Sequence, residues 1–166
     1  MIRRSMLMLG VVCVLPGCGV TATMRGLLGL DPKPVEPDWK SVALRTDDDA
    51  NGNSAVAVDV VLVKETAMLE SLLNMTASKW FATRSDLRKS FPEAMTVFSY
   101  ELAPSQSIKL SNKLWDGQKA WAALVFASYG TPGDHRARML LNTAGYVVQL
   151  RAQNFSASEI KSGSAQ

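Results

Sequence analysis

The sequence has a single histidine, His135, and only two cysteines among its 166 residues. Groups that titrate near neutral pH or bind transition metals are therefore scarce, and no G-x-S-x-G, H-E-x-x-H, C-x-x-C or P-loop pattern is present. His135 lies in the turn-rich stretch 131–136, where a solvated loop histidine is more common than a catalytic base. We therefore expect a protein that is not an enzyme and that has neither a cofactor nor a small-molecule substrate.

A hydrophobic run long enough to cross a membrane is also missing at the N-terminus. Arg3 and Arg4 precede an uncharged apolar run at 5–14, about half of the roughly 20 residues that a transmembrane helix needs. This layout is typical of an export signal that is later removed. The run ends in Leu-Pro-Gly-Cys at residues 15–18, which resembles the lipobox of bacterial lipoproteins.

The lipobox resemblance implies covalent lipid. In that family the cysteine thiol takes a diacylglycerol thioether, the preceding peptide bond is cut, and the new amine receives an acyl chain such as palmitate. Carried over, residues 1–17 are the signal peptide and Cys18 is the lipidated first residue. The alternative is a chance cysteine after a conventional signal. Gly19 stands where an aspartate commonly retains enterobacterial lipoproteins in the inner membrane, which favours the periplasmic face of the outer membrane.

Cleavage before Cys18 changes the composition. It leaves 149 residues, enough for one domain with its own core. Cys13 leaves with the signal and Cys18 is blocked, so the mature domain is expected to have no disulfide and no thiol nucleophile. Cleavage also removes Arg3 and Arg4, which reduces 18 basic residues to 16 against 15 acidic ones. No charge argument for nucleic-acid binding remains.

The mature chain divides into three parts. Residues 18–38 contain three glycines and three prolines with little apolar periodicity, which is typical of a tether between anchor and domain. We expect the folded domain to span residues 39–157 and residues 158–166 to form a flexible C-terminal tail.

Alternation of apolar and polar side chains predicts strands with one buried face. In the stretch 54–64, Val56, Val58, Val60 and Leu62 share one face. The stretch 120–129 is apolar on both faces, as in a central strand. The other strand candidates are Lys40–Thr46, Met95–Leu102, Ser107–Leu114, Arg138–Leu141 and Tyr146–Gln153.

About seven short strands separated by turns predict a mainly β protein, an antiparallel two-sheet β-sandwich. Its core is expected to centre on Trp121, Leu124, Val125 and Phe126. One region breaks the pattern, because apolar residues between positions 67 and 91 recur at helical spacing. We expect a short helical insertion at 66–91, made of two helices, with Thr76 as the N-cap of the second.

The stretch 47–53 is a polar segment between two strand candidates. Three successive aspartates repel one another and need water, and Asn51-Gly52 favours turn conformations, so we expect an exposed hairpin loop. The aspartates, with Asn51 and Asn53, raise the alternative of a cation site. The D-x-D-x-D-G spacing with a glutamate at the twelfth position is absent, however.

Taken together, the lipobox, the tether, the strand pair around a polar loop, the helical insertion and the later strands resemble the type VI secretion lipoprotein, the TssJ family. The similarity runs from about Val42 to Asn154. Ala-Val-Asp-Val-Val-Leu-Val-Lys at 57–64 is similar to that family's second strand, and Tyr-Glu-Leu-Ala-Pro at 100–104 to its strand before a proline turn. The family's leucine-proline-glycine turn and the arginine-proline pair of its first loop are absent.

The TssJ resemblance implies a transthyretin-like, Ig-like sandwich without enzymatic activity. It implies an anchor in the outer membrane and a role in holding the periplasmic end of the inner-membrane protein TssM. It also implies that the first loop binds this partner. The candidate partner-binding residues are Asp47, Asp48, Asp49, Ala50, Asn51, Gly52 and Asn53. The alternative is a pilotin-like or envelope-assembly lipoprotein of another secretion machine.

Overall fold

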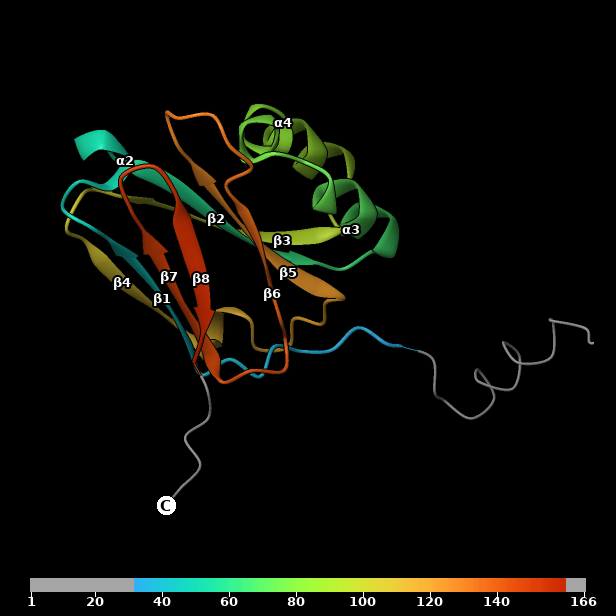
Figure 1. Ribbon diagram of the computed structural model, residues 1–166. Helices are drawn as coiled ribbons and strands as arrows, with labels where there is room; N and C mark the ends of the chain where they lie inside the picture. Colours follow the sequence, from blue (N-terminus) through green and yellow to red (C-terminus); the bar gives the residue numbers. More distant parts are fainter. Residues whose placement is uncertain (1–31, 161–166) are drawn as a thin grey trace, which may run out of the picture. The chain divides into compact units, whose positions relative to one another are not determined.

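The computed structural model describes residues 32–160 and contains two four-stranded β-sheets (Figure 1). The predicted signal peptide and Cys18 lie outside the described residues. One sheet has the order β4 (Ser107–Ser111), β1 (Ser41–Thr46), β7 (Gly145–Leu150), β8 (Phe155–Glu159). The other has the order β3 (Met95–Leu102), β2 (Val56–Val63), β5 (Ala122–Ser128), β6 (Arg136–Met139). The mainly β two-sheet sandwich predicted from the alternation is confirmed.

The strand pairs are antiparallel with one exception, the parallel pair of β1 and β7. Alternation reveals which face of a strand is buried but not the direction of its neighbour, so the sequence did not predict this pair. Gly145 opens β7 with a φ of 147°, and a Cβ at this position would collide with the backbone oxygen of Ser41. Glycine therefore allows β7 to begin directly beside β1.

The sandwich core lies between the two sheets. Val56, Val58, Val60 and Leu62 of β2 all point into it, as their alternation predicted. At one end of this core, Trp39 and Trp115 meet edge to face with ring centroids 5.4 Å apart. The Trp115 indole N–H also donates a 2.9 Å hydrogen bond to the Trp39 carbonyl oxygen, so these large side chains are buried with their polar atoms satisfied.

A helical layer covers the outer face of the β3-β2-β5-β6 sheet (Figure 1). It consists of α3 (Thr66–Leu73) and α4 (Ala77–Ser90), which confirms the helical insertion. The Thr76 hydroxyl accepts a hydrogen bond from the Lys79 N–H, as predicted for an N-cap. Trp80 of α4 stacks on Phe126 of β5 at 4.9 Å. Strand β5 therefore contributes to two cores, which explains why its sequence is apolar on both faces.

A buried carboxylate fastens α4 to the sheet. Asp59, on the helix-facing side of β2, is 0% exposed. One of its carboxylate oxygens accepts hydrogen bonds from the Trp80 indole N–H at 2.8 Å and from the Arg84 guanidinium at 2.6 Å. The same guanidinium lies 4.7 Å from the centre of the Phe81 ring. The ion pair satisfies a charge that would otherwise be very unfavourable inside the protein.

The structure differs from the prediction at several boundaries. Trp121, predicted at the centre of the core, is only partly buried because it precedes β5 at the end of the sandwich. Strand β4 stops at Ser111, and Leu114 lies in the 3₁₀ helix η1 (Asn112–Leu114) with its side chain exposed. Strand β8, which the alternation did not reveal, carries the domain past residue 157 to Glu159.

The tether prediction also extended too far. Val35, within the stretch assigned to the tether, exchanges two 2.9 Å backbone hydrogen bonds with Ala120. The Glu36 carboxylate accepts a hydrogen bond from the Gly117 N–H, and the Asp38 N–H donates to the Leu141 carbonyl. Prolines do not prevent such isolated contacts. The prediction from composition, which began the domain at residue 39, therefore placed its start too late.

Candidate functional site

The segment 47–53 connects β1 to β2, and these strands belong to different sheets. The predicted hairpin is therefore wrong, because the segment crosses from one sheet to the other. Strands that are adjacent in sequence usually pair, but here β1 pairs with β4 and β7 while β2 pairs with β3 and β5. The crossing places the segment over one end of the sandwich.

This end, which we call the α2 end, is formed by the loops 47–55, 103–106, 129–135 and 151–154. It takes its name from α2 (Ala50–Asn53), a single turn. Inside that turn Asn51 and Gly52 have φ values of 49° and 63°, and Asn53 has a φ of 60°. Asparagine and glycine tolerate this left-handed region better than other residues. The turn conformation predicted from Asn51-Gly52 is thus confirmed.

Three of the seven candidate residues face the protein. Ala50 is fully buried. One Asp47 carboxylate oxygen accepts a 2.7 Å hydrogen bond from the Gln149 side chain. The Asn51 side chain accepts from the Gly130 N–H at 2.8 Å and donates to the Ala55 carbonyl at 2.9 Å. These three residues hold the segment in place.

The remaining four candidate residues face solvent. They are Asp48, Asp49, Gly52 and Asn53. Because the first three residues fix the backbone, the two free aspartates are presented from a defined position. The α2 end therefore offers an exposed acidic edge on a rigid base, an arrangement suited to protein recognition.

Hydrogen bonds connect the loops of the α2 end to one another. The Ser105 N–H donates to the Asp47 carbonyl at 3.1 Å, and the Asn51 N–H donates to the Arg151 carbonyl at 3.1 Å. The Tyr129 hydroxyl donates to the Asn154 carbonyl at 2.7 Å. These contacts join all four loops, so the α2 end forms one surface.

A hollow of about 450 Å³ lies beside this surface, between the N-terminal part of α4 and the loop after β5. Phe81, Tyr129 and His135 line it, together with residues 130–133. The Tyr129 and His135 rings lie 4.6 Å apart, and His135 Nε2 is 3.0 Å from the Thr131 carbonyl oxygen. The histidine is thus partly buried in the loop rather than solvated. The turn-rich sequence around it did not indicate its contacts with Tyr129 and Thr131.

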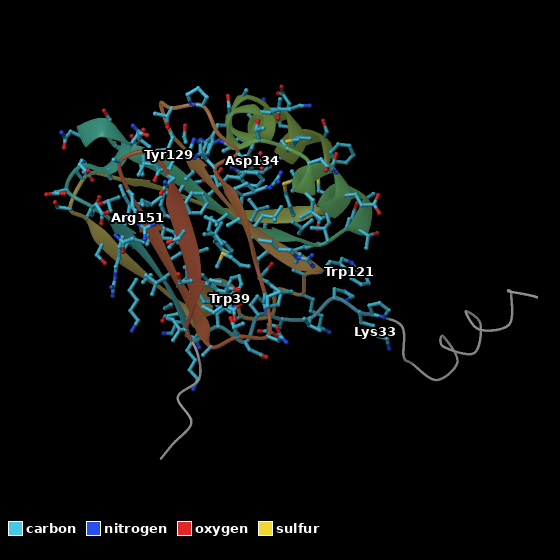
Figure 2. All side chains as sticks on the ribbon, in the orientation of Figure 1. Lys33, Trp39, Trp121, Tyr129, Asp134 and Arg151 are labelled. Atoms are coloured by element: carbon cyan, nitrogen blue, oxygen red, sulfur yellow. The ribbon has the colours of Figure 1, made fainter. Side chains whose placement is uncertain are left out.

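Tyr129 links two loops of the α2 end, 129–135 and 151–154, and Figure 2 shows it at the same end of the sandwich as Arg151. Its hydroxyl accepts from the Arg151 N–H at 3.2 Å while donating to Asn154. Burial raises the pKa of Tyr129 to about 12, and the contacts with Arg151 oppose the increase only in part. The neutral phenol is therefore the form that the folded protein favours.

Tyr129→Phe is expected to lower the free energy of unfolding by about 1–2 kcal/mol, because the loop carbonyl and N–H lose their partner. Since the folded pKa lies above the usual value of 10, the contribution of the neutral phenol is present below pH 10 and is lost as pH rises towards 12. Urea unfolding of both proteins at pH 7 and pH 11 tests this. A variant with a stability equal to that of the unchanged chain at pH 7 would contradict it.

The described residues contain neither a metal cluster nor a membrane span. Within residues 32–160, no three His, Cys, Asp or Glu side chains converge to hold a metal ion, so Asp47, Asp48 and Asp49 do not form such a group. In the same part of the chain, no helix has the length and apolar character that crossing a membrane requires.

Comparison with solved structures identifies the fold. The Pseudomonas aeruginosa type VI secretion lipoprotein TssJ1 superimposes with a TM-score of 0.53 at 13% identity, covering 79% of this chain and 100% of that one. Serratia marcescens Lip, a membrane-bound component of the type VI secretion system, gives 0.51 at 12% identity, covering 71% and 95%. A structure described as the TssM C-terminal domain from EAEC gives 0.51 at 12% identity, covering 72% and 97%.

These similarities show that the chain has a TssJ-like fold. No family model matches the sequence. No curated protein matches it by sequence either. The resemblance noted in the sequence is therefore confirmed for the fold.

Proposed function

We propose that this chain is a lipoprotein component of a type VI secretion membrane complex, with a structural rather than an enzymatic role. The observation that carries the proposal is the fold shared with two components of that system, the P. aeruginosa lipoprotein TssJ1 and the membrane-bound S. marcescens protein Lip. The sequence supports it independently, because residues 3–18 have the layout of an export signal and end in a stretch that resembles a lipobox at Cys18. In this proposal the domain lies on the periplasmic face of the outer membrane.

The proposed partner is the periplasmic region of a TssM-like inner-membrane protein. One of the similar structures is described as a TssM domain, which supports a partner of this type. The exposed part of segment 47–53 is the proposed contact, since Asp48 and Asp49 project from a base fixed by Asp47 and Asn51. The chain would then join the outer membrane to the inner-membrane part of the machine.

Co-purification tests the proposed assembly. The full chain, tagged at its C-terminus, is expressed with the TssM-like protein of the same gene cluster and extracted in mild detergent. Recovery of that protein in a stoichiometric complex supports the proposal. Recovery of a secretin or pilus subunit instead would favour the pilotin-like alternative and contradict the TssM assignment.

Cys18→Ser is expected to abolish acylation and to leave an uncleaved precursor or a soluble protein, because the thioether needs the cysteine thiol. Labelling of cells with a radioactive fatty acid, followed by immunoprecipitation, measures this. Cys13→Ser is the matched control and is expected to label like the unchanged chain. Equal labelling of the Cys18→Ser protein would remove the lipoprotein assignment.

A further inference from the structure

The large apolar side chains that are exposed within residues 32–160 gather at one end of the molecule. They are Val35, Phe91, Leu114 and Leu140, with exposed fractions between 39% and 50%. This end, which we call the Lys33 end, is opposite the α2 end. Strand β5 runs between the two ends, from Ala122, next to the Val35 pairing, to Ser128, next to the Asn51 contact. Figure 2 shows Trp121 and Tyr129 correspondingly far apart.

Topology explains why these four residues share an end. Val35 pairs with Ala120 just before β5, and Leu140 directly follows β6. Leu114 lies in η1 after β4, whose last residue pairs with the first residue of β1. Phe91 follows α4, just before β3 begins beside the last residue of β2. All four therefore lie at the same end of the sandwich.

Three apolar side chains at this end surround a hollow of about 380 Å³. Val35, Trp121 and Leu140 line it, above the more buried Met139 and Leu141. Trp121 is the only one of the four tryptophans that is not buried, since Trp39, Trp80 and Trp115 are at most 2% exposed. Tryptophan beside an exposed leucine and valine is typical of a surface that lies at a membrane interface.

Charges around the hollow are nearly balanced. Arg138 lines it, Lys33, Lys113 and Lys119 belong to segments at the same end, and none of these four side chains forms an ion pair within residues 32–160. The neighbouring carboxylates are Glu36, Asp38 and Asp116, of which Glu36 already accepts a hydrogen bond from Gly117. Long basic side chains can lie along an apolar surface with their charge in the headgroup layer. Apolar contact, with modest help from cations, is therefore the expected source of affinity.

We propose that the Lys33 end lies against the headgroup layer of a phospholipid bilayer, with Val35, Trp121 and Leu140 inserted. The position of Lys33 supports a bilayer as the occupant, because Figure 2 shows this first residue of the domain at this end, and the sequence that follows Cys18 leads to it. If Cys18 is acylated, residues 19–32 can span at most about 50 Å, so this end is held near the membrane. The several acyl chains proposed on Cys18 would anchor the protein stably by themselves, and contact at the Lys33 end would fix the orientation of the domain against the bilayer.

The inference rests on the proposed membrane anchoring for its setting, but the test uses protein without acyl chains. Every described contact of both cores lies within residues 33–160, so a protein comprising Lys33–Gln166 retains them. This protein is mixed with vesicles of phosphatidylethanolamine and phosphatidylglycerol, unlabelled or with brominated acyl chains. Trp121 then reports contact directly, since the other three tryptophans are buried.

We expect the protein to float with the vesicles and its tryptophan emission to shift to the blue. Brominated lipid should quench this emission, and the quenching should disappear in Trp121→Phe. Val35→Asp with Leu140→Asp should weaken vesicle binding about tenfold or more. Ala82→Asp with Ser85→Asp, on the exposed face of α4, adds the same charge elsewhere and should bind normally. Thermal unfolding verifies that each variant is folded.

Two results would overturn the inference. One is vesicle binding that the Val35 and Leu140 substitutions leave unchanged. The other is an absence of vesicle binding together with a soluble dimer that these substitutions dissociate, which would assign the surface to a second copy of the chain. Neither result bears on acylation, which the labelling of Cys18 tests separately. Binding that survives about 0.5 M salt supports apolar insertion rather than charge attraction alone.

Discussion

Arg84→Ala is expected to lower the free energy of unfolding by about 2–4 kcal/mol, because it leaves the Asp59 carboxylate buried without its cation. Asp59 is fully buried and would retain a single donor, the Trp80 indole N–H. Breaking a fully buried pair costs about 3–5 kcal/mol, and the lower range applies here because the Arg84 side chain is 33% exposed. Equilibrium unfolding in urea measures the change.

Two further variants separate the ion pair from the other contacts of Arg84. Arg88→Ala, on the same helix but exposed, is the control and should change stability by less than about 0.5 kcal/mol. Asp59→Asn combined with Arg84→Ala should recover part of the loss, because no uncompensated charge stays behind. If the double variant is as unstable as the sum of the two single changes, the pair is not coupled and the loss comes from the Phe81 contact.

Asp48→Lys with Asp49→Lys should weaken capture of the periplasmic region of the TssM-like partner at least about tenfold, without changing the fold. Both side chains are exposed, so their replacement disturbs no described contact of the α2 end. Reversing two charges at the proposed interface changes electrostatic complementarity with the partner. Surface plasmon resonance with the purified mature domain at two salt concentrations measures the affinity.

Glu93→Lys with Asp116→Lys is the matched control for this experiment. It makes the same change in net charge at exposed positions of the opposite end. If both double variants lose affinity equally, net charge rather than the acidic edge determines binding. If neither loses affinity, recognition lies elsewhere on the sandwich. Asp47→Ala, in contrast, should act through the fold, because it removes the acceptor of Gln149.

The layers of the fold could be predicted because the pattern of apolar and polar residues along each strand indicates which of its faces are covered. Val58 and Val60 alternate with residues that face the helices, and Leu124 and Val125 lie in different cores. Trp121 misled the prediction because it continues the same alternation one position before the strand begins. Periodicity assigns a face, whereas burial also depends on whether another layer extends to that position.

Much of the α2 end could not be predicted, because its contacts join loops that are distant in sequence. The composition of 47–53 indicated exposure and a turn. Asp48 and Asp49 are indeed exposed, and Asn51-Gly52 forms the turn. No local pattern indicated that Asn51 would accept from Gly130, or that Tyr129 would bond to Asn154. The aromatic residue at the end of the apolar run 120–129 was the only available signal.

The parallel pairing of β1 with β7 has a consequence for the order of folding. Strand β1 is synthesised before the other strands, yet its neighbours β4 and β7 follow much later, and the contact of Asp47 with Gln149 spans 102 residues. The chain must therefore close a loop that encloses most of the domain before this sheet can form, and such non-local contacts slow folding. A nascent chain therefore remains without a complete sandwich until β8, which ends at Glu159, has been synthesised.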